Sequence, residues 1–160
     1  MAVRYDRPFK ISGGVLLQNR RHKAGILRTV KTPCLDDHEI NPAGFEVKGS
    51  LVAESASIVL KVLYTARMIR PDIYHSVNTL AREVTRWTRA CDKRLHRLMC
   101  YLHHNSDLVL TCHLGDPAHK LKLALYSDSS FADCLSTSKS CSGVVLQLVG
   151  PNTCVPLTWL

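Results

Sequence analysis

The chain has 160 residues, of which 46% are hydrophobic and 21% charged, with a formal net charge of +8 at pH 7. This composition excludes an intrinsically disordered chain, and the length allows one core or two small half-domains. No apolar run reaches membrane-spanning length and the first residues lack the core of a signal peptide, so we expect no membrane partner and an intracellular location, cytoplasmic or nuclear.

Residues 1–47 are predicted to be a basic N-terminal segment followed by a linker. Up to Lys31 the only acidic residue is Asp6, and the apolar residues show no sustained period. The segment is either an arm that contacts phosphates or a frayed end, and the frayed end is the simpler interpretation. From Thr32, prolines and a glycine break regular structure, which predicts a linker up to about residue 47.

Residues 48–105 are predicted to form a helical region. Apolar residues recur with a 3.6-residue period from Leu51 to Met68, and Ser50 is the expected N-cap. Pro71 restarts the chain for a second helix, because proline is accepted in a first helical turn. A third helix is expected at about residues 90–103.

The third helix and the residues before it carry a basic face. Lys93 and Arg97 lie nearly opposite the apolar stripe, and Arg86 and Arg89 precede them. This face is either a track for a nucleic-acid backbone or a solvated helix surface. The net charge favours a nucleic-acid partner, since Lys and Arg that neutralise phosphates release counterions.

The seven cysteines and the histidines of this helix do not predict a metal site. No two cysteines are spaced as Cys-x-x-Cys, which argues against a disulfide framework or a zinc ribbon. His96, Cys100, His103 and His104 come near one helical face, but no second pair of ligands has zinc-site spacing. We therefore interpret them as half-buried helix residues and the cysteines as reduced thiols.

In residues 106–160 the apolar residues recur with a period of two instead of 3.6. Strands are predicted at 108–113, 121–126, 143–149 and 153–159, the last two joined as an antiparallel hairpin through Gly150-Pro151-Asn152. Helices followed by strands indicate an α+β fold. The strand at 121–126 delivers Asp128 to its end, where a carboxylate can help to anchor a hard cation such as Mg²⁺, although one carboxylate cannot hold the ion alone.

Six short motifs resemble, in order and spacing, the Pol polyprotein of copia-type retrotransposons. They are Lys48-Gly49-Ser50-Leu51, Leu63-Tyr64-Thr65-Ala66-Arg67, Arg70-Pro71-Asp72-Ile73, Leu98-Met99-Cys100-Tyr101-Leu102, Tyr126-Ser127-Asp128 and Ser140-Cys141-Ser142-Gly143. The resemblance covers Thr32 to Trp159. It implies the end of a reverse transcriptase in residues 1–47, a helical connection in 48–105, and in 106–160 an incomplete sheet like the first strands of a ribonuclease H fold.

The resemblance also implies a role for Asp128. In that family the matching aspartate is the first metal-binding carboxylate of ribonuclease H, where paired Mg²⁺ ions support cleavage of the RNA strand in an RNA–DNA hybrid. Here the family's second aspartate is Ser130, its tryptophan is Phe131 and its glycine is Asp133, and the other carboxylates of both activities would lie outside this chain. Asp128 is therefore interpreted as a vestigial ligand that binds no Mg²⁺ by itself.

Three functions follow from these observations. The first is a fragment or degenerate remnant of a reverse transcriptase and ribonuclease H polyprotein, inactive alone, whose partners would be the rest of that polyprotein and an RNA–DNA hybrid. The second is a non-catalytic nucleic-acid-binding module that uses Arg86, Arg89, Lys93 and Arg97. The third is a non-functional relic whose basic charge is inherited.

Overall fold

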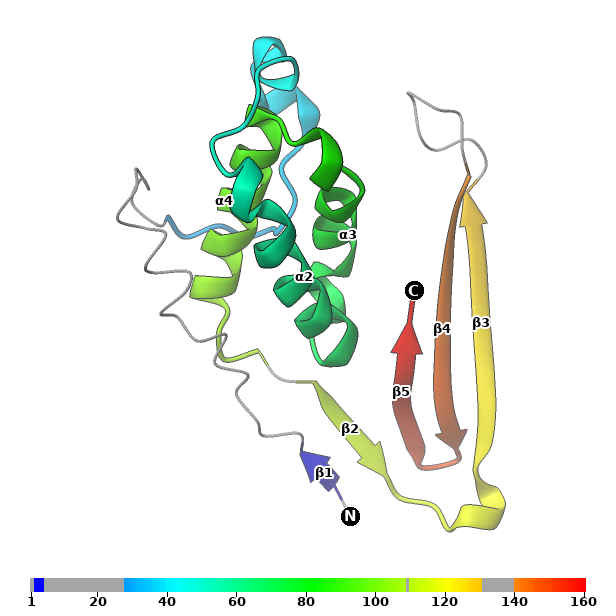
Figure 1. The fold of residues 1–160 in the computed structure, drawn as a ribbon. Coiled ribbons are helices and arrows are strands. Elements are labelled where there is room, and N and C mark those ends of the chain that lie inside the picture. The colour runs from blue at the N-terminus through cyan, green and yellow to red at the C-terminus, as the bar shows by residue number, and fades with distance from the viewer. Residues whose placement is uncertain (1, 5–27, 109, 131–139) are drawn as a thin grey trace. The chain divides into compact units, whose positions relative to one another are not determined.

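A computed structural model describes residues 2–4, 28–108, 110–130 and 140–160. The described residues divide into a helical unit, residues 28–108, and a sheet unit, residues 2–4, 110–130 and 140–160. Figure 1 shows helices α2, α3 and α4 in the helical unit and strands β1 to β5 in the sheet unit. The α+β class predicted from the order of the sequence periods is confirmed.

Helix α2 spans Val52–Met68, as the 3.6-residue period predicts. The face that it buries includes Ile58, Val59, Val62 and Ala66. The helix ends at Met68, and the backbone N–H of the next residue, Ile69, still donates to the carbonyl of Thr65. The first predicted helix is therefore confirmed to within one residue.

The next two helices follow after short 3₁₀ turns. Pro71–Ile73 forms the first turn and leads into α3, Tyr74–Arg82. Val84–Arg86 forms the second and leads into α4, Arg89–His104. The three helices share one hydrophobic core, whose largest fully buried side chains include Ile73, Leu80, Leu98, Val59, Val62 and Val77.

The start of α2 is held differently from the prediction. Ser50 was expected to cap the helix with its side chain, but Leu51 is the N-cap and makes no side-chain cap hydrogen bond. The carboxylate of Asp92, in the first turn of α4, instead accepts from Ser50 N at 2.5 Å, Ser50 Oγ at 2.9 Å and Leu51 N at 3.3 Å. A residue distant in sequence satisfies the backbone donors that a local cap usually serves.

The segment predicted as a linker has structure of its own. Residues Asp37–Glu39 and Pro42–Phe45 form two 3₁₀ turns, and Ile40 between them is only 3% exposed. Asn41 caps the second turn, because its side chain accepts from the backbone N–H of Ala43. The prolines and glycine break long helices here without leaving the chain unpacked.

The sheet unit is antiparallel throughout its described strands. These are β1 (Ala2–Arg4), β2 (Thr111–Leu114), β3 (Lys122–Ser130), β4 (Cys141–Gly150) and β5 (Thr153–Trp159). They follow the order β1-β2-β5-β4-β3. The predicted β4–β5 hairpin is confirmed, with a register irregularity between Leu146 and Gln147.

Asp116 holds the turn between β4 and β5. Its carboxylate accepts from the backbone N–H of Asn152 at 2.7 Å. It also lies directly over Gly150, where a Cβ atom would be 2.5 Å from Asp116 Oδ2. A side chain at this position would displace the carboxylate that fixes the turn.

No helix among the described residues combines the length and the apolar character that crossing a bilayer requires.

Candidate functional site

Asp128 lies within β3, opposite Gly143 of β4. The sequence placed this carboxylate at the end of its strand, but β3 continues to Ser130 because its pairing with β4 extends that far. The side chain is exposed, and its Oδ1 accepts from the backbone N–H of Ser129 at 2.9 Å. Asp128 is thus a solvent-facing residue of a regular strand.

The described residues around Asp128 do not fit a Mg²⁺ site. Among all the residues that the structure describes, the only group of three potential ligands is Asp36, His38 and Glu39, an exposed cluster in the helical unit that does not include Asp128. Asp133, which follows the motif, lies outside the described residues. Mg²⁺ needs near-octahedral oxygen ligands, and phosphodiester cleavage by paired metals needs several carboxylates. We therefore derive no metal-dependent step through Asp128.

The predicted basic face of α4 is only partly free. Arg89, Lys93 and Arg97 are spaced four residues apart and so lie along one side of the helix. Arg89 and Lys93 are exposed. Arg97 instead donates through Nε to the carbonyl of Thr32 and through Nη2 to Thr32 Oγ1, both at 3.0 Å.

Arg86 precedes the helix and pairs weakly with an acid on its own turn. Its Nη2 lies 3.6 Å from Glu83 Oε1, and its side chain is 77% exposed. A pair at this exposure contributes little to stability, so the guanidinium can turn toward another anion. The structure thus leaves Arg86, Arg89 and Lys93 accessible and assigns Arg97 to an internal contact.

Arg94 was missed by the sequence analysis. Its guanidinium pairs with the carboxylate of Asp37 and lies 5.5 Å from the centre of the Phe45 ring. Together with Arg97, it fastens residues 32–45 onto α4. No local pattern predicts this, because the partners are separated by about fifty residues or more of sequence.

The Arg70-Pro71-Asp72-Ile73 motif forms an internal lock. Arg70, only 6% exposed, donates to both carboxylate oxygens of Asp72 at 2.8 Å and to the carbonyl of Asn105 at 2.9 Å. Its guanidinium carbon also lies 5.9 Å from the centre of the Tyr101 ring. The lock therefore ties the turn before α3 to the last turn of α4.

The contacts among Arg70, Asp72 and Tyr101 shift the pKa values of all three side chains. Burial alone would raise the pKa of Asp72, but hydrogen bonds and charge attraction from Arg70 outweigh it and lower that pKa. The hydrogen bond from Asp72 raises the pKa of Arg70 against the opposing effect of burial. Burial, reinforced by Asp72, raises the pKa of Tyr101. Charged Arg70 and Asp72 and neutral Tyr101 are the forms that this arrangement stabilises.

Gly49, from another motif, is required by close packing. A Cβ atom at this position would lie 2.5 Å from Trp87 Cδ1 and 2.7 Å from the carbonyl oxygen of Thr88. Trp87 is held in place by a 2.7 Å hydrogen bond from its Nε1 to Asp92. The glycine lets residues 47–49 run beside residues 87–89, where Gly49 N donates to Trp87 O and Arg89 N donates to Val47 O.

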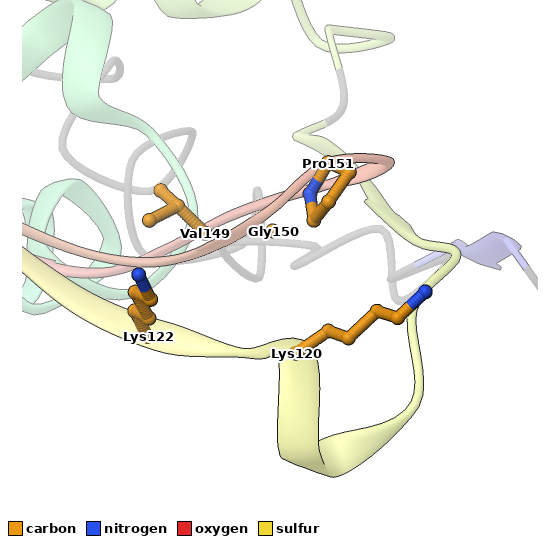
Figure 2. Close-up of a pocket in the computed structure, with 5 residues that line it drawn as sticks. All are labelled: Lys120, Lys122, Val149, Gly150 and Pro151. Atoms are coloured by element: carbon orange, nitrogen blue, oxygen red, sulfur yellow. The ribbon is translucent and has the colours of Figure 1, made fainter.

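An open hollow lies at the start of β3. Figure 2 shows Lys120 and Lys122 on one side of it and Val149, Gly150 and Pro151 on the other. Lys122 lies opposite Val149 in the sheet register. Two lysines beside apolar side chains make a shallow cationic surface without a defined set of polar ligands.

Comparison of the chain with known protein families, with curated proteins and with solved structures finds no match.

Proposed function

We propose that this chain is a fragment or degenerate remnant of the Pol polyprotein of a copia-type retrotransposon, from the end of the reverse transcriptase to the start of ribonuclease H. The observation that carries the proposal is the position of Asp128. It lies on β3, the first strand of the antiparallel run β3-β4-β5, which follows the helical unit in the chain. This is the order that the motif series implies.

The motifs of the helical unit support the same origin. Gly49, Arg70 and Tyr101 all take part in contacts between segments distant in sequence. Packing contacts explain how a chain folds, but they do not identify a chemical step, because fold and function are argued from different observations. The helical motifs therefore account for how this unit packs, and only Asp128 bears on catalysis.

The remnant is proposed to be catalytically inactive by itself. Electrostatic catalysis depends on groups that are fixed around the reacting phosphate. Within residues 2–4, 28–108, 110–130 and 140–160, Asp128 belongs to no cluster of potential metal ligands. An isolated, exposed carboxylate would leave a Mg²⁺ ion largely hydrated and unpositioned.

Hydrolysis of a labelled RNA–DNA hybrid in the presence of Mg²⁺ tests this proposal. The purified chain and its Asp128→Asn variant are expected to give the same background rate, with an authentic ribonuclease H as positive control. Mg²⁺-dependent cleavage that Asp128→Asn abolishes would show a working site and overturn the proposed inactivity. The DNA that flanks the coding region tests the origin, because a polyprotein source predicts a paired-aspartate polymerase turn upstream.

The second candidate is a nucleic-acid-binding module without chemistry. The observation that favours it is the pair Arg89 and Lys93, exposed on one side of α4 in a chain with a net charge of +8. Cations spaced along a helix can follow a phosphate backbone and gain affinity through counterion release. An RNA–DNA hybrid is the natural probe for both candidates.

A further inference from the structure

Strand β3 forms a long open edge of the sheet. It has nine residues, Lys122–Ser130, and is the last strand in the order β1-β2-β5-β4-β3. Within the described part of the chain, β4 is its only neighbour. β3 contains no proline, and its pairing with β4 is regular from Lys122 to Ser130. Proteins commonly block such edges with prolines or bulges, because unpaired backbone groups recruit another strand.

The register shows which backbone groups of β3 face the open side. Val144 and Leu160 exchange both hydrogen bonds, at 3.1 and 2.9 Å, so the backbone groups of Val144 point toward β5. By alternation, those of Val145 point toward β3, where Tyr126 is its partner. Tyr126 therefore bonds to β4, and the N–H and C=O groups of its sequence neighbours point outward.

By the same alternation, the backbone N–H and C=O groups of Leu123, Leu125 and Ser127 all point to the open side of β3. Ser129 has the same parity, and its N–H bonds to the Asp128 carboxylate, as expected for a donor that does not serve β4. Leu123 and Leu125 are each 67% exposed. The edge thus combines free backbone donors and acceptors with apolar side chains that have room for a partner.

The sequence of β3 is complementary to itself when it is laid antiparallel around Leu125. In this register Lys122 lies opposite Asp128 of a second copy, and the same pair recurs on the other side of the two-fold axis. Leu125 lies opposite itself as a hydrogen-bonded pair. Lys122 and Asp128 then form non-hydrogen-bonded pairs, in which the side chains are closest. Centring the axis on Leu123 or Ser127 would not bring these two charges together.

We infer that β3 pairs antiparallel with β3 of a second copy of this chain, which gives a two-fold symmetric dimer with Lys122 of each protomer opposite Asp128 of the other. A two-fold interface of this kind uses the same surface on both subunits. In this dimer the β3 edge of each protomer is paired with that of the other. The exposed leucines of the two β3 strands then form one continuous surface.

Analytical ultracentrifugation of the full chain under reducing conditions tests the dimer. The wild type is expected to show a concentration-dependent monomer–dimer equilibrium. Leu125→Pro is expected to abolish it, because proline removes an outward N–H and leaves the bonds between β3 and β4 in place. Leu157→Ala, an exposed leucine of β5 away from this edge, is the matched control and should dimerise like the wild type.

Charge exchange tests the register. Lys122→Glu and Asp128→Lys should each weaken dimerisation by about tenfold, since each places like charges opposite one another. The double variant should recover the wild-type association. It again places opposite charges at positions 122 and 128 across the interface, with the signs exchanged. A wild type that is monomeric at all concentrations would overturn the dimer and point to another strand on this edge. Dimers that resist Leu125→Pro, or a double variant without recovery, would overturn the β3 interface or its register.

Discussion

At the scale of single residues, the sequence motifs of the helical unit have packing roles. Gly49 provides space for Trp87, and Arg70 joins the start of α3 to the end of α4. Asp92 accepts hydrogen bonds from Ser50, Leu51 and Trp87. The sequence identified Gly49 and Arg70 by resemblance, but it gave no indication of Asp92, whose partners become neighbours only in the folded helical unit.

Gly49→Ala should destabilise the helical unit by about 1–3 kcal/mol, the usual cost of overpacking. The added methyl group would meet the Trp87 ring and the Thr88 carbonyl, and a backbone carbonyl cannot easily move aside. Urea unfolding followed by tryptophan fluorescence measures the loss. Gly143→Ala is the matched control, because the nearest atom to its new Cβ is 4.0 Å away. Equal stability of Gly49→Ala and wild type would contradict this packing role.

At the scale of elements, the contacts of Arg70 fix where α3 begins relative to where α4 ends. Pro71 sets the local turn, as the sequence predicts. The bidentate pair with Asp72 and the bond to the Asn105 carbonyl then join the two helices. A buried arginine with these partners makes the junction sensitive to the ionisation of Asp72.

The stabilising effect of Asp72 should depend on pH. Its pKa is lower in the folded protein than in the unfolded chain, so its contribution is complete above the unfolded value of about 4 and is lost as the pH falls through the folded value. Asp72→Asn should therefore be less stable than wild type at pH 7, and the difference should shrink in acid. Urea unfolding from pH 7 to pH 3 measures it, with exposed Asp107→Asn as control. A difference that stays constant over this range would exclude the linkage.

At the scale of the whole molecule, the net charge of +8 is not distributed as the sequence indicates. Arg70, Arg94 and Arg97 are engaged in internal contacts. Of the four cations of the predicted basic face, Arg89 and Lys93 remain exposed, together with Arg86, which pairs weakly with Glu83. Within the predicted face, Arg97 is therefore held by hydrogen bonds to Thr32, while the side chains of Arg86, Arg89 and Lys93 can turn toward a phosphate.

Binding of an RNA–DNA hybrid should fall steeply with salt if the chain is a nucleic-acid-binding module. Arg89→Gln and Lys93→Gln should each weaken binding and reduce the slope of log K against log salt by about 1. Fluorescence anisotropy from 50 to 300 mM salt measures both effects. Lys61→Gln, on the exposed face of α2, is the matched control for loss of one charge. Absent or salt-independent binding would favour the relic.

The sequence alone determined the three helices and the hairpin that follows them, but not strand β1 or the 3₁₀ turns between residues 37 and 45. The 3.6-residue period located α2, Pro71 marked the start of the helix that became α3, the apolar stripe marked α4, and the period of two located the β4–β5 hairpin. These patterns are readable because each reflects which side of a helix or strand is buried, a property of neighbouring residues. The α+β class follows from their order.

Only the tertiary structure decided which distant residues meet. It pairs β1 with β2, places Asp92 at the start of α2 and assigns Arg97 to Thr32. It also makes β3 an edge strand, on which Asp128 belongs to no cluster of potential metal ligands among the described residues. These contacts join residues far apart in sequence, and their formation depends on how whole elements pack, so no local period encodes them.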